Sequence, residues 1–310
     1  MFGKIVAMIM TLTAAVSIVG CGEEETIGTP RIAVTEYYSY CDVPDSAVFI
    51  ANDSKAYLLD KATGEVSVCC DEATAVSAYG DELLIYQLSQ DRIIRTDGSV
   101  WYDLNELDTK QFPLRGFEVG YDGGAELYTT NVFGTNALYS IEAGEAVYEG
   151  SFDVPLFDGN KLSGWIIVIE QDDGNVIHEL EYQNKTYSLF TLAGGIGSVN
   201  YNNYLLNSDA GIFACKSDNE AFLLWLDDET KLQMPDGTAF FALYHDCVLY
   251  IVPGTNGAPA MLYAADFDGN VQMLMKYNGS RIIIPDTYEK KLYLVDLDSM
   301  TADTIDLLIK

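Results

Sequence analysis

Basic residues are scarce in this chain of 310 residues, which holds 17 Lys and Arg against 47 Asp and Glu and has a formal net charge of -30. A polyanion repels the phosphate backbone, and no cluster of Lys and Arg forms a basic stripe, so we expect no nucleic-acid partner. The partner should instead be neutral or cationic. The charge does not predict disorder, because 49% apolar residues are ample for a packed core.

The motifs of several enzyme classes are also missing. Only two histidines occur, His178 and His245, and no Cys-x-x-Cys is present, so a zinc site has no support. No Gly-x-Ser-x-Gly occurs, and the glycine-rich stretch 194–197 is followed by a strand pattern without Lys or a helix. We therefore predict no cofactor and lean against an enzyme, although these absences do not decide the matter.

A long apolar stretch occurs only at the N-terminus. Lys4 precedes the apolar and small residues 5–20, which are too few to cross a bilayer comfortably and have the form of a secretory signal peptide. The following Ile18-Val19-Gly20-Cys21 resembles a bacterial lipobox. This resemblance implies cleavage after residue 20 and acylation of Cys21, including palmitate-type chains, which would hold the protein on a membrane. An ordinary signal peptide or an uncleaved anchor helix is the alternative.

A short polar tether follows the signal peptide over residues 21–30. Its acidic triplet at 23–25 resembles the export signals of some surface-displayed outer-membrane lipoproteins, although a solvated spacer is the simpler interpretation. Removing residues 1–20 also removes Lys4, so the mature charge is -30 minus +1, or -31. We predict an exported protein anchored by lipid to the cell membrane or the outer membrane, with display on the cell surface as a further possibility.

An exported protein lives where disulfides persist. Five cysteines remain in the mature domain, and this odd number leaves at least one thiol unpaired. Cys41 with Cys69 or Cys70, and Cys215 with Cys247, are plausible pairs. The alternative is that all five are small buried apolar residues.

The remainder of the chain, residues 31–310, shows a repeat. Short apolar strands precede tight turns of Gly, Asp or Asn, and strands rich in Leu and Tyr follow them. Turn markers stand at 52, 80, 122, 158, 202, 245 and 286, at intervals of 28, 42, 36, 44, 43 and 41 residues. Five of these six intervals lie near the forty or so residues of one propeller blade.

We therefore predict one all-β domain, a β-propeller of six or seven blades with seven favoured. The short first interval would give six blades if the first and last units form one blade. The segment 31–38 reads as a strand that could supply the missing outer strand of the last unit and so close the ring. The chain resembles the broad class of bacterial lipoprotein β-propellers, without a WD or kelch motif. A pair of β-sandwiches is the alternative architecture.

One turn has the composition of a calcium loop. Asp266, Asp268 and Asn270 place oxygen ligands at alternate positions, and the negative charge of the protein would favour Ca²⁺. The glycine comes too early for an EF-hand, and the closing Glu is replaced by Tyr277. A hairpin turn is therefore the favoured interpretation, with calcium as the alternative.

Carboxylates are the remaining candidates for chemistry. Some propellers carry a catalytic pair at the central channel, and the acids at the predicted blade starts could gather there. These acids are Asp81, Asp122, Asp158, Asp246 and Asp286. Among 47 acids no pair stands out, so a glycoside hydrolase or polysaccharide lyase remains the alternative function. The function that we favour is a lipid-anchored binding or scaffold protein of the bacterial cell envelope, with a protein or glycan partner.

Overall fold

The computed structural model is nearly all β. It describes residues 37–307 except 107–113, 122–124, 132–135, 141–144, 148–153, 159–160, 194–202, 217–219, 236, 245, 255–257, 269 and 278–280. These residues form 27 strands and one short 3-10 helix, Leu104–Glu106. No helix among them has the length and apolar character required to cross a membrane.

The strands form seven separate sheets within the described residues, each an antiparallel meander in which consecutive strands pair. The first and second sheets consist of β1 Tyr37–Val43, β2 Ser46–Ala51, β3 Ala56–Asp60 and β4 Val66–Cys70, then β5 Ala75–Tyr79, β6 Glu82–Gln87, β7 Arg92–Arg95 and β8 Val100–Asp103. The third and fourth consist of β9 Leu114–Tyr121, β10 Ala125–Asn131, β11 Asn136–Ser140 and β12 Glu145–Val147, then β13 Val154–Asp158, β14 Lys161–Glu170, β15 Asn175–Tyr182 and β16 Lys185–Ala193.

The last three sheets follow the same pattern. The fifth and sixth consist of β17 Asn203–Asn207, β18 Ile212–Lys216, β19 Ala221–Trp225 and β20 Lys231–Gln233, then β21 Ala239–Leu243, β22 Cys247–Val252, β23 Ala260–Asp266 and β24 Val271–Tyr277. The seventh has three strands, β25 Ile282–Pro285, β26 Lys291–Asp296 and β27 Thr301–Asp306.

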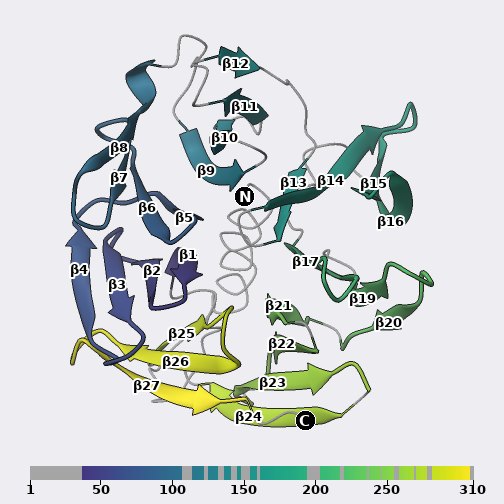
Figure 1. Cartoon of the computed structure of the whole chain (residues 1–310). Helices are drawn as coiled ribbons and strands as arrows, with labels where there is room; N and C mark the ends of the chain where they lie inside the picture. The colour runs from purple at the N-terminus through teal and green to yellow at the C-terminus, as the bar shows by residue number, and fades with distance from the viewer. Residues whose placement is uncertain are drawn as a thin grey trace, which may run out of the picture.

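The sheets stand around a central axis in chain order, so the last lies beside the first (Figure 1). The first strand of each sheet is innermost and the last strand is outermost. This arrangement is a β-propeller and excludes the alternative of paired sandwiches. We use "hairpin face" for the face of the ring that carries the turns between the first and second strands and between the third and fourth strands of each sheet.

Burial explains the apolar composition of the inner strands. The second strand of the sixth sheet, β22, is buried along almost its whole length, because neighbouring sheets cover both of its faces. The outermost β20 and β27 are largely exposed and carry polar residues. The described core consists of separate clusters between neighbouring sheets, such as Phe49 and Leu59 with Ile284 and Val295, which joins the first sheet to the last.

The predicted N-terminal closure is not what the described residues show. Tyr37 and Tyr38 belong to β1, which pairs with β2 in the first sheet and not with the seventh; residues 31–36 lie outside the described residues. The outer rims of the first and last sheets are instead joined at an isolated bridge between Glu65 and Thr301. Two backbone hydrogen bonds, Val66 N to Met300 O at 3.0 Å and Ala302 N to Gly64 O at 2.8 Å, hold this bridge.

Two of the turn markers were assigned to the wrong place in their sheets. Position 52 lies in the second turn of the first sheet, between β2 and β3, whereas the first turn lies at 44–45. Counted from Asp45, the interval to Gly80 is 80 minus 45, or 35 residues, so the anomalous value of 28 disappears. Position 202 likewise precedes β17, whose turn to β18 lies at 208–211. The first and last units form two separate sheets.

Candidate functional site

None of the five cysteines that the structure describes, Cys41, Cys69, Cys70, Cys215 and Cys247, forms a disulfide, so the suggested pairs are absent among the described residues. Cys215 belongs to the core between the fourth and fifth sheets, whereas Cys247 belongs to the core between the sixth and seventh. Cys70 is held by the Gln87 amide, whose Nε2 lies 3.2 Å from its Sγ. Burial raises the pKa of the Cys69 thiol to about 12, which leaves it unreactive at neutral pH. Cys21 lies outside the described residues.

The suggested calcium loop is a tight turn between β23 and β24. Asp266 Oδ1 accepts hydrogen bonds from the backbone N–H groups of Asp268 and Asn270, at 3.1 and 2.7 Å, and Oδ2 accepts one from the Asn270 amide at 2.7 Å. The Asp266 carboxylate is thus used to hold the turn. No group of three or more acids, histidines or cysteines suited to a metal ion occurs within the described part of the chain.

The acids predicted at the channel mouth have different surroundings. Asp286 is buried, Asp246 forms an ion pair with Lys290, and Asp81 is exposed in the turn between β5 and β6. Asp122 lies outside the described residues, as does the side chain of Asp158. No hydrogen bond joins any two of the three described carboxylates, so the structure does not assemble them into one pair.

The acid that is buried most deeply belongs to an ionic cluster between the first and last sheets. Lys61, in the turn between β3 and β4, places its Nζ 2.8 Å from Asp42 Oδ2 and 2.9 Å from Asp286 Oδ1, and all three side chains are at most 5% exposed. Thr287 donates its backbone N–H and its hydroxyl to Asp42, at 2.9 and 2.7 Å. We name Asp42, Lys61, Asp286 and Thr287 the closing cluster.

The closing cluster holds two carboxylates but one ammonium group. Burial raises the pKa of Asp42, against the lowering effect of Lys61 and Thr287. Asp286 Oδ1 also accepts the backbone N–H groups of Tyr288 and Glu289, at 2.9 and 3.0 Å. The ring of Tyr288, which is 55% exposed, lies 5.2 Å from Lys61 Nζ and covers the cluster on the hairpin face. Through these contacts the closing cluster joins the first sheet to the last sheet of the ring.

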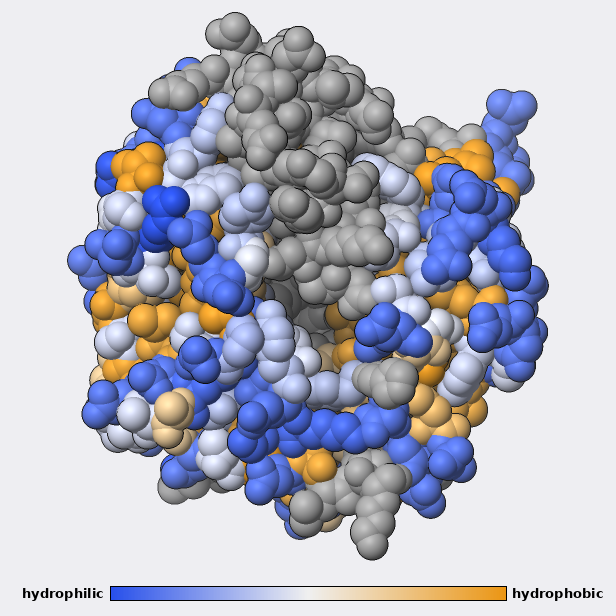
Figure 2. Space-filling model, in the orientation of Figure 1, coloured by the Kyte–Doolittle hydropathy of each residue, from blue (hydrophilic) through white to orange (hydrophobic). Residues whose placement is uncertain are grey.

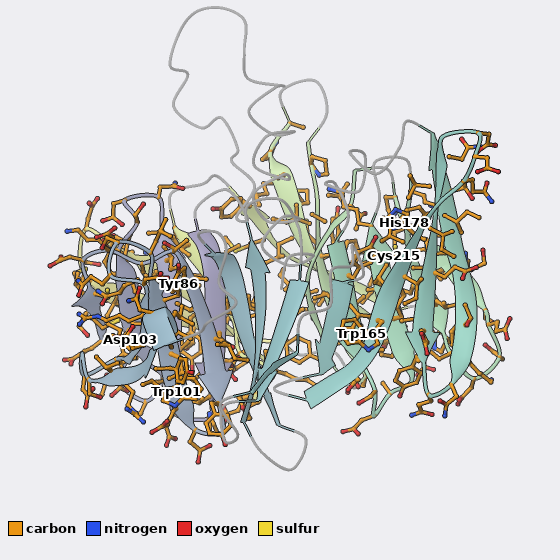
Figure 3. All side chains as sticks on the ribbon, turned by 90° about the horizontal axis from the view of Figure 1, so that it is seen from above. Tyr86, Trp101, Asp103, Trp165, His178 and Cys215 are labelled. Carbon is orange, nitrogen blue, oxygen red and sulfur yellow. The ribbon has the colours of Figure 1, made fainter. Side chains whose placement is uncertain are left out.

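A second buried polar group lies between the fourth and fifth sheets. His178 on β15 stacks on Phe190, and its Nδ1 lies 3.0 Å from the hydroxyl of Tyr204 on β17. Tyr204 is the cross-strand partner of Cys215, which Figure 3 shows on the same side of the molecule as His178. Burial lowers the pKa of His178 to about 4 and raises that of the Cys215 thiol, so both are neutral near pH 7. They therefore do not form the ion pair of a cysteine nucleophile.

A small pocket opens where turns of the fourth and fifth sheets meet on the hairpin face. It encloses about 230 Å³, and its lining comes from the β15–β16 turn, the β17–β18 turn and the residues that follow β19. We name it the rim pocket. Its residues are Tyr182, Gln183, Lys185, Tyr187, Ser208, Asp209, Ala210, Gly211, Leu226 and Asp227.

Hydrogen bonds between the two sheets fix the walls of the rim pocket. Tyr187 donates its hydroxyl to Leu226 O at 2.9 Å, and Tyr182 donates its hydroxyl to Ser208 O at 3.5 Å. Within the fourth sheet, Gln183 Nε2 donates to the Tyr182 hydroxyl at 2.8 Å. Lys185, Asp209 and Asp227 are exposed at its edge, where one cation and two anions give a net charge of -1. At about 230 Å³ the rim pocket is smaller than the roughly 300–1,000 Å³ of common ligand pockets, so it has room only for a small molecule.

The rim pocket was not predicted from the sequence. Its turns are separated by about twenty residues each and come from two different sheets, so no local motif unites them. One local signal was available. Gln183 and Asn184 form a two-residue turn with φ of 49° and 61°, although glycine is the usual residue for a positive φ.

No protein-family model matches the sequence, and no curated protein is similar to it. Solved structures are similar in fold. The tricorn protease matches with a TM-score of 0.52 at 13% identity, over 93% of this chain and 34% of that chain. The extracellular domain of BT4673 from B. thetaiotaomicron, described as a one-component system, matches with 0.51 at 14% identity, over 93% of this chain and 41% of that chain.

The Cps50 (Swd1) β-propeller domain of Myceliophteria thermophila matches with a TM-score of 0.49 at 14% identity, over 85% of this chain and 94% of that domain. This chain thus spans well under half the length of the BT4673 domain and of the tricorn protease. Identities this low show similarity of fold and nothing about activity.

Proposed function

We propose that this protein is a lipid-anchored, extracytoplasmic binding protein of the bacterial cell envelope, with the rim pocket as its ligand site. The observation that carries the proposal is the rim pocket itself, because its walls are held by hydrogen bonds between two sheets before any ligand arrives. A preformed site loses little conformational entropy on binding. The propeller provides the rigid frame on which its turns are mounted.

The proposed location is supported by the N-terminus and by one structural neighbour. Cys21 ends a lipobox-like sequence after a signal-like segment. The domain of BT4673 that shares this fold is extracellular. Anchoring through Cys21 would place the polar tether, residues 21–30, between the membrane and the domain. The cell membrane and the outer membrane both suit this arrangement.

The proposed ligand is a small neutral or cationic molecule with several polar groups. The rim pocket carries a net charge of -1, and the protein as a whole carries -30. An anionic ligand would be repelled both by the charge of the rim pocket and by the charge of the whole protein. Sugars fit this description, since hydroxyl groups can pair with Gln183, Lys185 and Asp209 at the edge of the rim pocket. A small organic cation fits it as well.

Thermal melting in the presence of glucose, N-acetylglucosamine, glycine betaine or putrescine tests the ligand site. We expect at least one of these probes to raise the Tm, because a ligand that binds only the folded state stabilises it. Ala210→Trp should fill the rim pocket and abolish the increase. Ala62→Trp, at an exposed turn of the first sheet, is the matched control and should keep it. An unchanged Tm with every probe, or an increase that survives Ala210→Trp, would refute the proposed site.

Metabolic labelling with radioactive palmitate tests the anchor separately. The full chain should incorporate label and sediment with membranes, whereas Cys21→Ala should do neither. Labelled, membrane-bound Cys21→Ala protein would show that the anchor has been misassigned. The predicted channel-mouth acids that the structure describes, Asp81, Asp246 and Asp286, do not form a pair with one another, so the hydrolase or lyase alternative stays a prediction.

A further inference from the structure

Three of the eight large apolar side chains that are exposed among the described residues lie on the outer rims of two neighbouring sheets. These are Leu232 on β20, which is 48% exposed, and Val271 and Met273 on β24, at 58% and 51%. We name these three residues the rim patch. Exposed apolar side chains scattered singly are ordinary, but a group on one surface indicates an interaction site.

Strand register places the rim patch on the facing sides of the fifth and sixth sheets. Leu232 is the cross-strand partner of Leu223, and Met273 and Val271 are the partners of Tyr263 and Ala265. Directly paired residues project to the same side of a sheet. Leu223, Tyr263 and Ala265 all belong to the cluster that packs the fifth sheet against the sixth. The rim patch is therefore the exposed outer continuation of that core.

The strand that carries two of these residues is also an open sheet edge. β24 is the outermost strand of the sixth sheet, and no described strand pairs with its outer side. It has seven residues, whereas β20 beside it has three, so its edge continues past that of its neighbour. Outer strands are commonly protected by charged or polar side chains. β27 follows this rule with Thr301, Asp303 and Asp306, but β24 exposes Val and Met.

Charge distinguishes between the partners that could cover the rim patch. The turn before β20 carries the exposed acids Asp227, Asp228 and Glu229, and the turn before β24 carries the exposed Asp268. Both turns lie on the hairpin face, so this end of the rim patch is negative. At the other end of β24 lies the exposed Lys276. A second copy of the chain would bring a charge of -30 against -30 and would be repelled.

We propose that β24 binds an extended segment of a partner protein by strand addition. The segment would pair with the β24 backbone and place alternate apolar side chains against the rim patch. Lys or Arg residues at one of its ends would face the acidic turns 227–229 and 266–268. Backbone pairing would provide the affinity, and the side chains on one face would provide the specificity. This site shares Asp227 with the edge of the rim pocket, but β24 and the rim patch, which carry the proposal, are not part of that pocket.

The test uses the full domain and a fluorescein-labelled peptide of alternating Val and Thr with two Lys at one end. We expect binding in fluorescence anisotropy, and at least about tenfold weaker binding when Glu replaces the two Lys or when the peptide backbone is N-methylated. The double variant Val271→Thr, Met273→Thr should weaken binding to a similar extent. Both side chains are exposed, so its melting curve should match that of the wild type.

The matched control is Val68→Thr, Val100→Thr, which removes two exposed valines from the outer strands of the first and second sheets. It should leave binding unchanged. Absence of binding to the wild type, or equal binding to the wild type and the Val271→Thr, Met273→Thr variant, would overturn the proposal. Sedimentation equilibrium adds a further outcome. A wild-type dimer that the Val271→Thr, Met273→Thr variant dissociates would assign the rim patch to a second copy and refute a separate partner.

Discussion

His178 shows how burial, and not a catalytic partner, determines the state of a titratable residue in this fold. The sequence offered the residue as one of only two histidines, on a strand and without a motif. In the structure it is fully buried between two sheets, with one ring nitrogen facing Tyr204 and the other, Nε2, without a hydrogen-bond partner. No local pattern in the sequence relates His178 to Tyr204, which is twenty-six residues away and lies beside the ring.

The lowered pKa of His178 makes stability depend on pH. The folded state holds the imidazole neutral with a pKa of about 4, whereas the unfolded chain titrates near 6.5. Its contribution is therefore complete above pH 6.5 and is lost as the pH falls towards 4. The loss should be about 3 kcal/mol at most. Urea unfolding at pH 7 and pH 4.5 measures it. The variant His178→Phe, Tyr204→Phe removes both polar partners and should show a smaller difference, and an equal difference in both proteins would contradict this assignment.

Gly64 lies where the backbones of the first and last sheets are hydrogen-bonded, since its carbonyl accepts the N–H of Ala302 at 2.8 Å. It has a φ of +73°, and an added Cβ would lie 2.7 Å from Ala302 O. Gly64→Ala should therefore cost about 1–3 kcal/mol from the backbone conformation, and more from this collision with the seventh sheet. Gly98, in the equivalent turn of the second sheet, has a φ of +85° and open space around it. Chemical denaturation should find Gly64→Ala less stable than Gly98→Ala, and equal stabilities would show that the contact is easily relaxed.

At the scale of strands, the sequence was sufficient where apolar residues and turns alternate strongly. The apolar run 248–252 lies within β22, and the apolar run 291–295 lies within β26. The alternating residues on either side of Asp173-Gly174 form a hairpin, with Ile169 paired to Ile177. It was harder to predict whether a given strand is the first, second or third of its sheet. Turns after the first strand and after the second strand have similar compositions, so the sequence predicts a first turn at position 52, where the structure has a second turn.

The connection between the first and last sheets could not be predicted from local sequence. Lys61 and Asp286 are 225 residues apart, and each belongs to a turn whose composition looks merely polar. The rim pocket likewise could not be predicted from local sequence, because its turns become neighbours only when two sheets pack side by side. Strand patterns therefore predict the sheets of a propeller well, whereas contacts between sheets depend on side chains that no local pattern relates.

The closing cluster provides a test at the scale of these two sheets. Lys61→Met should destabilise the domain by about 3–5 kcal/mol, because it leaves two buried carboxylates without their cation. Asp42→Asn should cost much less, because burial raises the pKa of Asp42 and its ionisation is unfavourable in the folded state. The free-energy cost of ionising Asp42 in the folded state is absent below the pKa that Asp42 has in the unfolded chain. It grows as the pH rises above that value and is complete above the pKa of Asp42 in the folded state. Urea unfolding at pH 7 compares the two variants.

A matched variant separates lost charge pairing from lost packing. The triple change Lys61→Met, Asp42→Asn, Asp286→Asn removes all three charges while it keeps similar volumes. It should recover part of the stability that Lys61→Met loses, since neutral buried groups avoid the desolvation penalty of unpaired charges. If the triple variant is less stable than Lys61→Met alone, the two carboxylates are solvated well enough to tolerate the loss of Lys61, and the closing cluster has another role.

For the whole molecule, the acidic composition is spread over the turns and outer strands. The face in Figure 2 is mostly hydrophilic, with apolar patches between polar ones. Several of the acids hold their own turns: Asp60 accepts the backbone N–H groups of Ala62 and Thr63, both at 2.9 Å, and Asp173 and Asp296 do the same in other sheets. These hydrogen bonds keep the pKa of Asp60 below its usual value. Turn geometry therefore explains part of the acid content, and the remaining acids repel one another across the ring.

This repulsion predicts how the domain responds to ions. Raising NaCl from about 10 mM to about 150 mM shortens the Debye length from about 30 Å to about 8 Å, so Tm should rise as distant acids cease to interact. A bound Ca²⁺ ion would act differently, since it would stabilise at millimolar concentration and its removal would lower Tm. The Asp266 carboxylate already accepts three hydrogen bonds within its own turn. We therefore expect differential scanning calorimetry to give the same Tm with EDTA and with 1 mM CaCl₂ at matched ionic strength. A higher Tm in calcium that Asp268→Asn abolishes would instead place a cation at the β23–β24 turn and would explain why so acidic a ring tolerates its charge.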